Sequence, residues 1–156
     1  MISNFGFRKQ HWTTNAVTKL INDIGKYLDI KESVLTIYCD LSRAFDTINH
    51  GIVLKNRHYY GIRGHALGRF RSYLAERKHY VNYNGQDSEV EGIGIGVPQG
   101  SVLGPLLFII YVNDLPDCLT SSDSILFTDD TTIYGHNTNI NHRFNTMTIE
   151  LHSLMD

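Results

Sequence analysis

Three aspartates stand at the ends of apolar, β-branched segments, where a charged side chain is costly to hold. Asp40 directly follows Ser33–Cys39 (SVLTIYC), which is typical of a buried strand. Asp129–Asp130 separates Ser124–Phe127 from Thr131–Tyr134, two further segments typical of strands. Neighbouring residues of a strand face opposite sides of a sheet, but a tight turn relaxes that rule. The sequence therefore predicts a sheet in which both carboxylates of the pair can face one site.

Helices are predicted around these strands. Apolar residues recur at helical spacing over residues 13–28, 50–60, 64–76, 102–113 and 141–155, and Thr13 or Thr14 can cap the first of these helices. Two short strands are predicted over residues 78–83 and 89–95, with a turn at Asn84–Gly85. We expect one α+β domain over residues 1–156, with a sheet backed by helices.

Charge is unevenly distributed along the chain. The net charge is −2, a poor match to a self-sufficient nucleic-acid-binding protein. Residues 55–79 nevertheless hold seven Lys or Arg residues against one Glu. Two interpretations stay open for this segment, a solvated helical face and a surface that follows a phosphate backbone.

The cysteines and the apolar runs bear on the protein's environment. Cys39 and Cys118 stand alone, which fits a reducing compartment better than a disulfide scaffold. The longest apolar run, residues 102–112, is shorter than the ~20 residues that span a bilayer, so we expect no membrane partner. The sequence does not distinguish the nucleus from the cytoplasm.

Carboxylates in this arrangement are suited to a divalent cation. Adjacent like charges repel each other, and a bound cation removes that cost. Hard oxygen ligands without thiols or paired histidines indicate Mg²⁺ (or Mn²⁺). An alternative also stands, because an Asp at a strand end or in a hairpin often only forms the turn.

Three motifs in order resemble those of reverse transcriptases from non-LTR retrotransposons. Asp40–His50 resembles motif A, Gly96–Phe108 resembles motif B, and Phe127–Thr131 resembles motif C, the aromatic-X-Asp-Asp box. Shorter matches fit the jockey-like branch of that family. They are Phe5–Lys9 followed by Thr13–Thr14, Tyr59–Gly64 and Asn113–Pro116.

The resemblance implies an RNA-directed DNA polymerase with a palm-type sheet. Its partners would be an RNA template, a DNA primer and a dNTP, and Asp40, Asp129 and Asp130 would be both catalytic residues and metal ligands. Phe45 would lie under the incoming sugar and exclude a 2′-hydroxyl. The residues implied in nucleotide binding are Leu41, Phe45, Gln99, Gly100 and Arg8.

The chain also departs from the family pattern. Thr128 replaces the small residue, usually Ala, that precedes the Asp pair, and Gly51 replaces the commoner Asp. The resemblance covers partial fingers and the palm core, truncated at both ends; the thumb and the missing fingers segments are expected from a longer parent protein. An alternative function follows, that of a truncated, inactive retroelement relic that folds or binds nucleic acid without polymerising.

Overall fold

The computed structural model describes residues 4–7, 10–41, 43–56, 60–98 and 100–155, and it mixes helices with a sheet. The chain forms two compact units. Residues 1–42 and 112–156 form the sheet unit, and residues 43–111 form the helix–hairpin unit.

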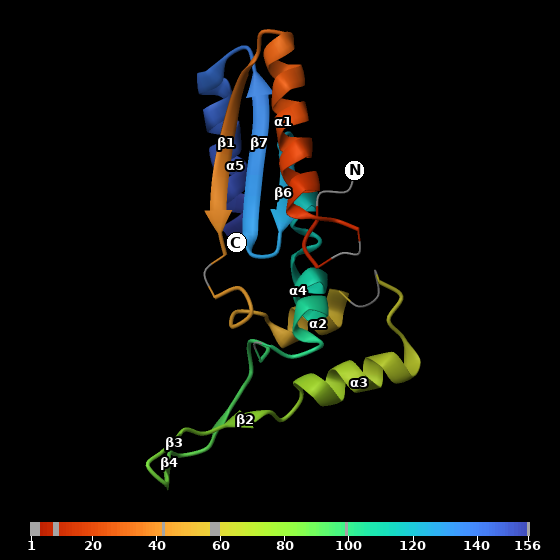
Figure 1. The fold of residues 1–156 in the computed structure, drawn as a ribbon, viewed down its shortest axis with the longest axis vertical. Coiled ribbons are helices and arrows are strands. Elements are labelled where there is room, and N and C mark those ends of the chain that lie inside the picture. Colours follow the sequence, from red (N-terminus) through yellow and green to blue (C-terminus); the bar gives the residue numbers. More distant parts are fainter. Residues whose placement is uncertain (1–3, 8–9, 42, 57–59, 99, 156) are drawn as a thin grey trace. The chain divides into compact units, whose positions relative to one another are not determined.

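The sheet unit is built on three antiparallel strands, β1 (Ser33–Asp40), β6 (Asp123–Phe127) and β7 (Asp130–Asn137). Their order is β1-β7-β6, so β7 lies in the centre (Figure 1). The strands predicted at the three aspartates are all confirmed, each one or a few residues longer than predicted.

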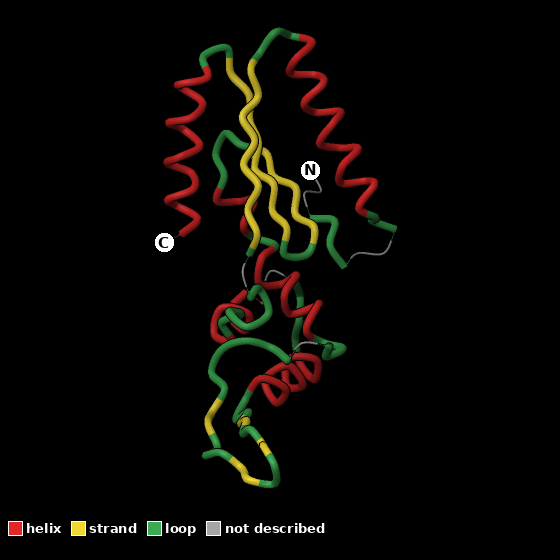
Figure 2. Tube along the Cα trace, turned by 60° about the vertical axis from the view of Figure 1, so that its left-hand side comes forward, coloured by secondary structure: helices red, strands yellow, loops and turns green. Residues whose placement is uncertain are grey.

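Two helices, α1 (Thr13–Asp29) and α5 (Ile140–Met155), cover opposite faces of this sheet (Figure 2). Successive residues of β7 show the division, because Tyr134 contacts α1 whereas Gly135 lies against Arg143 of α5. On the α1 side, Phe5, Ala16, Ile125 and Tyr134 form a buried cluster.

Tyr134 also anchors α1 through polar contacts. Its hydroxyl donates to Asp23 Oδ2 at 2.8 Å, and Lys19 Nζ lies 2.5 Å from the same oxygen. Burial alone would raise the pKa of Asp23, but hydrogen bonds from Lys19, Tyr134 and Lys26 outweigh it and lower the pKa to about 2. The central strand and α1 are therefore joined by a charged hydrogen-bond network as well as by apolar packing.

The start of α1 differs from the prediction. Trp12, not Thr13 or Thr14, precedes the first turn as the N-cap, with an extended backbone. Asn15 Oδ1 accepts a hydrogen bond from the Trp12 amide at 3.2 Å, so the cap is closed from inside the helix.

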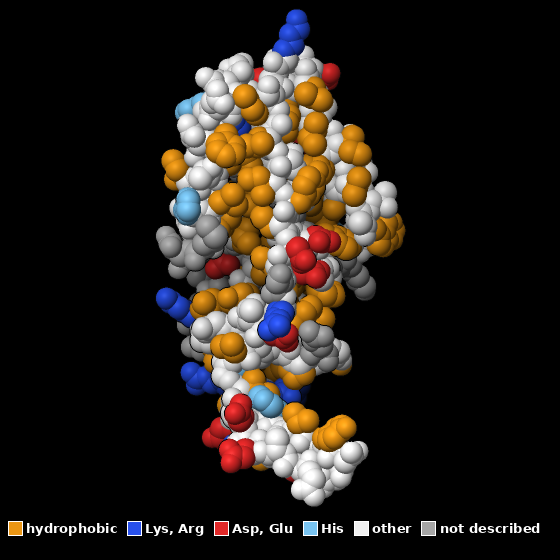
Figure 3. All heavy atoms as spheres, turned by 90° about the vertical axis from the view of Figure 1, so that its left-hand side faces the viewer, with side chains coloured by type: hydrophobic (Ala, Val, Ile, Leu, Met, Phe, Trp, Pro, Cys, Tyr) orange, Lys and Arg blue, Asp and Glu red, His pale blue; other side chains and the backbone are white. Residues whose placement is uncertain are grey.

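Hydrophobic side chains remain on the surface of the sheet unit (Figure 3). Ile21 of α1 is 63 % exposed, Tyr38 of β1 is 73 % exposed and Phe144 of α5 is 60 % exposed. Phe144 precedes Met147 by one helical turn, a spacing that favours the same side of α5, yet Met147 is buried and Phe144 is not. Arg143 takes the inward position instead, with its guanidinium lying against Gly135.

The helix–hairpin unit contains three helices and an extended hairpin among its described residues. The helices are α2 (His50–Asn56), α3 (Gly64–Leu74) and α4 (Gly104–Val112), the last of which ends at the edge of the unit. The hairpin carries β2 (Lys78–His79), β3 (Asn82–Tyr83), β4 (Gln86–Asp87) and β5 (Glu91–Gly92). The predicted turn at Asn84–Gly85 is confirmed, with φ of 50° and 77°.

Two further features complete the fold. Ser101 caps α4, because its Oγ accepts a hydrogen bond from the Gly104 amide at 3.0 Å. A 3₁₀ helix, η1 (Leu115–Cys118), precedes β6. Within the described residues, none of the helices is long and apolar enough to cross a membrane.

Candidate active site

The register of the sheet brings two of the three aspartates together. Asp40, the last residue of β1, is paired directly with Asp130, the first residue of β7. Directly paired residues of antiparallel strands project to the same face, with Cβ atoms ~4.5–5.5 Å apart. Both side chains are exposed to solvent. Two carboxylates that are 90 positions apart in the sequence therefore lie side by side at one end of the sheet.

Asp129 belongs to the turn that joins β6 to β7 at the same end of the sheet. Phe127 pairs with Asp130, which leaves Thr128 and Asp129 as the two turn residues. The Leu41 amide donates a hydrogen bond to the Asp129 carbonyl at 3.1 Å. This bond extends the pairing of the β1 segment one residue beyond Asp40 and ties Leu41 to the turn.

The three carboxylates have the donor chemistry for a hard cation, but their side chains are not arranged around a common ion position. Oxygen donors of this kind suit Mg²⁺ or Mn²⁺. In the part of the chain that is described, no three or more His, Cys, Asp or Glu side chains are arranged to hold a metal ion. The backbone thus gathers the carboxylates at one end of the sheet, and their side chains would have to turn toward a common ion.

The N-terminal segment contacts β6 and the turn that contains Asp129. The Phe5 amide donates to the Leu126 carbonyl at 2.7 Å, and Asn4 forms a parallel bridge with Leu126. Gly6 then lies against Thr128, where an added Cβ would overlap the Thr128 nitrogen and lie 3.0 Å from its Cα. Only glycine fits at position 6 without a shift of this backbone.

Thr128 has an unusual backbone conformation within the turn. Its φ is 58°, in the left-handed region that β-branched residues rarely adopt. Such a conformation costs on the order of 1–3 kcal/mol and persists only where the surroundings impose it. The contacts of the N-terminal segment with residues 126–128 are such surroundings.

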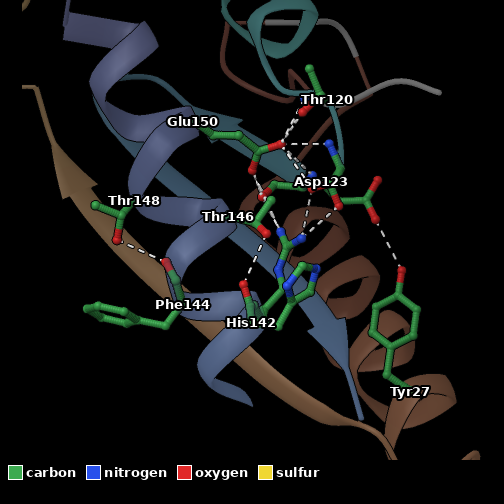
Figure 4. Close-up of polar contacts among 11 residues, drawn as sticks. Tyr27, Thr120, Asp123, His142, Phe144, Thr146, Thr148 and Glu150 are labelled. Atoms are coloured by element: carbon green, nitrogen blue, oxygen red, sulfur yellow. Dashed lines mark hydrogen bonds and ion pairs between the residues drawn. The ribbon is translucent and has the colours of Figure 1, made fainter. Parts of the chain in front are cut away.

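A buried carboxylate holds the loop that leads into β6 (Figure 4). Glu150 of α5 accepts hydrogen bonds from the Thr120 amide at 2.9 Å and the Ser121 amide at 2.6 Å, and it also contacts the Ser122 hydroxyl. Burial alone would raise the pKa of Glu150, but the bonds from Ser122, Ser121 and Thr120 outweigh it and lower the pKa to about 2.

Arg143 completes this network from the preceding turns of α5. Its guanidinium donates to the Ser121 carbonyl at 3.1 Å and lies 3.8 Å from Glu150. Both side chains are only 4 % exposed, so the ion pair is buried. The network fixes the entry of β6, the strand that ends at the Asp129 turn.

Phe45 and Gly100 belong to the helix–hairpin unit, whereas the aspartates belong to the sheet unit. The Phe45 ring lies 5.2 Å from the Phe108 ring, and its carbonyl accepts a hydrogen bond from the Val97 amide at 2.8 Å. Gly100 is exposed, with a φ of 78° that favours glycine. The segment that leads to Gly100 is therefore hydrogen-bonded to the backbone of Phe45. Arg8 and Gln99 lie outside the described residues.

Sequence reasoning missed several residues around these groups. Arg143 and Glu150 lie on the inward side of α5 together with Met147. Their helical spacing from Met147 could have indicated from the sequence that both charged side chains are buried. Gly6 gave no such signal, because its partner Thr128 is distant in the sequence. His50 ends the segment that resembles motif A, but the sequence predicted no separate role for it.

Comparison with known proteins identifies relatives of the chain. Residues 3–152 match the family model described as reverse transcriptase (RNA-dependent DNA polymerase). The chain is 34 % identical over 113 residues to the RNA-directed DNA polymerase from mobile element jockey of Drosophila melanogaster. It is 35 % identical over 113 residues to the probable RNA-directed DNA polymerase from transposon X-element of Drosophila melanogaster.

A third relative gives the same result. The chain is 36 % identical over 118 residues to the probable RNA-directed DNA polymerase from transposon BS of Drosophila melanogaster. Each of these three alignments covers 72 % of this chain and 12 % of the relative. The chain thus spans about an eighth of the length of these relatives.

Proposed function

Because this chain belongs to the reverse transcriptase family, in the jockey-like branch of the non-LTR retrotransposons, we propose that it carries the catalytic centre of an RNA-directed DNA polymerase. The reaction is the template-directed transfer of a dNMP from a dNTP to the 3′-OH of a DNA primer on an RNA template. The observation that supports the proposal most strongly is the pairing of Asp40 with Asp130 beside the Asp129 turn.

Asp40, Asp129 and Asp130 would hold two Mg²⁺ ions (or Mn²⁺), and the chemistry that such ions would supply is activation of the primer hydroxyl and stabilisation of the leaving pyrophosphate. The carboxylates are exposed at one end of the sheet, so a triphosphate and a primer end could reach them. The hydrogen bond from Leu41 to Asp129 keeps the segment after β1 beside the turn. The chain's own contribution is to hold these groups in place.

The nucleotide-binding residues form the other part of the proposal. Phe45 would exclude a 2′-hydroxyl, and Leu41, Gln99, Gly100 and Arg8 would contact the nucleotide. In this assignment the sheet unit is the palm core, and the chain also contains part of a fingers region. The relatives are longer proteins, since the aligned part of this chain covers 12 % of their length.

Primer extension on an RNA template with Mg²⁺ tests the proposal. We expect extension by the chain and none by Asp129→Asn/Asp130→Asn. The matched control is Asp29→Asn/Asp117→Asn, which removes two exposed carboxylates elsewhere and should extend as the unchanged chain does. A folded chain that gives no extension would reject the polymerase and leave the alternative, an inactive relic. Extension that survives in the Asp129 and Asp130 variant would reject the assigned residues.

A further inference from the structure

Two segments of the helix–hairpin unit run together beside Phe45. The Gly96 amide donates to the Ile48 carbonyl at 2.8 Å, and the Val97 amide donates to the Phe45 carbonyl at 2.8 Å. Asn49 and Ile95 form an antiparallel bridge next to these bonds. The segment that follows Asp40 is thus paired with the segment that leads to Gly100.

The approach at Gly96 leaves no space for a side chain. An added Cβ would lie 2.7 Å from the Asp46 carbonyl oxygen, and the φ of Gly96 is 81°. Both the space and the conformation require glycine. The Gly96 peptide is therefore turned so that its amide and its carbonyl both meet residues 46–50.

His50 holds the other side of this peptide. Its Nε2 lies 2.6 Å from the Gly96 carbonyl oxygen, and the side chain is half-buried. A carbonyl oxygen only accepts hydrogen bonds, so Nε2 must carry the proton in this contact. Gly96 is consequently bound on both sides, through its amide by Ile48 and through its carbonyl by His50.

The backbone of His50 is itself fixed at the start of α2. Asn49 Oδ1 accepts hydrogen bonds from the Gly51 amide at 2.9 Å and the Ile52 amide at 3.2 Å. This is an N-cap, which holds the first turn of the helix in place. The pair Asn49–His50 therefore has two separate tasks, because Asn49 caps α2 and His50 reaches across to Gly96.

We infer that His50 is a positioning residue for the incoming nucleotide: its Nε2–H fixes the Gly96 carbonyl and so keeps the Gly100 segment in register with Phe45. This inference rests on the proposed function, which assigns Phe45 and Gly100 to nucleotide binding. His50 does not contact the reacting atoms in this assignment. Its loss should therefore weaken nucleotide binding and sugar selection more than it slows the chemical step.

Hydrogen exchange of backbone amides in the full chain tests the contact without any need for activity. His50→Ala should speed exchange of the Gly96 and Val97 amides by ~2- to 10-fold, the effect of one lost hydrogen bond. His50→Gln should restore most of the protection, because the Gln side-chain amide can donate from nearly the position of Nε2. His65→Ala removes an exposed histidine of α3 and serves as the control.

Two results in this assay would overturn the contact. One is unchanged protection of Gly96 and Val97 in His50→Ala. The other is a His50→Gln variant that exchanges as fast as His50→Ala. If His50→Ala does not fold, as judged by circular dichroism, the comparison of His50→Gln with the unchanged chain decides, and loss of protection in His50→Gln overturns the contact.

Single-nucleotide primer extension with dNTP or rNTP tests the role in selection. We expect His50→Ala to raise the KM for dNTP by ~2- to 10-fold and to lower the preference for dNTP over rNTP, with kcat changed less and both parameters restored in His50→Gln. Equal KM and selectivity in His50→Ala and the unchanged chain would overturn this role. Absence of extension by the unchanged chain would reject the proposed function and the role in selection together, whereas hydrogen exchange would still decide the contact.

Discussion

Gly6 lies directly against the backbone of Thr128, although 122 positions separate the two residues in the sequence. The contact joins the N-terminal segment to the turn of Thr128 and Asp129, which leads directly into Asp130. It also explains why the strained backbone of Thr128 is retained, since the Phe5 amide binds Leu126 beside it.

Gly6→Ala should therefore destabilise the chain. The added methyl group would meet the Thr128 backbone, which cannot turn away as a flexible side chain could. Overpacking of this kind costs ~1–3 kcal/mol, and urea unfolding measures the change in the free energy of unfolding. Gly25→Ala is the matched control, because nothing lies within 4 Å of a Cβ at this helical position. It should be stabilising by ~0.5–1 kcal/mol. A Gly6→Ala chain as stable as the unchanged one would show that the contact is not close.

Thr128→Gly should raise stability or leave it unchanged, despite the loss of a side chain. Glycine adopts a φ of 58° without steric cost, so the strain of ~1–3 kcal/mol disappears. The greater freedom of glycine in the unfolded chain opposes this gain by ~0.5–1 kcal/mol. Thr132→Gly, in the regular part of β7, should instead be destabilising. Thr132→Gly should therefore lower the free energy of unfolding more than Thr128→Gly does. Equal destabilisation by the two substitutions would contradict the strain at Thr128.

Glu150 should make stability depend on pH in the acid range. Its pKa lies at about 2 in the folded chain against an ordinary 4.5, so the carboxylate stabilises the fold above pH 4.5. That stabilisation should be lost as the pH falls from 4.5 to about 2. The pKa of Asp23 is also lowered to about 2, so part of the same decline belongs to Asp23.

Glu150→Gln tests this assignment. The variant should be less stable by ~3–5 kcal/mol at pH 7, because the charge of Arg143 stays buried without the opposite charge of Glu150. Its stability should also fall less steeply between pH 4.5 and 2, as measured by thermal unfolding at several pH values. Glu91→Gln, at an exposed position in the hairpin, should change neither quantity. An unchanged pH slope in Glu150→Gln would contradict the low pKa.

Local patterns in the sequence predicted most of the secondary structure. The apolar segment before Asp40 and the two segments around Asp129 are strands because their β-branched and aromatic residues pack well in a sheet. Asn84–Gly85 forms the predicted turn because both residues tolerate a positive φ. The hairpin strands are shorter than predicted. Ser88 contributes, since its Oγ accepts the bond of the Val81 amide between β3 and β2.

The site depends on pairings that local patterns do not contain. A strand-like segment does not state its partner, so the register of Asp40 with Asp130 appears only in the folded chain. Helical spacing alone favours Phe144 beside Met147, yet Arg143 takes the inward position because Gly135 leaves room for its guanidinium. The contacts of Gly6 and His50 join segments distant in the sequence and gave no local sign.

Binding of Mn²⁺ to the isotope-labelled chain, followed by NMR, tests whether Asp40, Asp129 and Asp130 form one divalent-cation site. We predict that line broadening starts at the amides of Leu41, Asp129 and Asp130, disappears from them in Asp40→Asn/Asp130→Asn and persists in Asp29→Asn/Asp117→Asn. Broadening that starts elsewhere, or that survives in Asp40→Asn/Asp130→Asn, would show that these three carboxylates do not form the cation site.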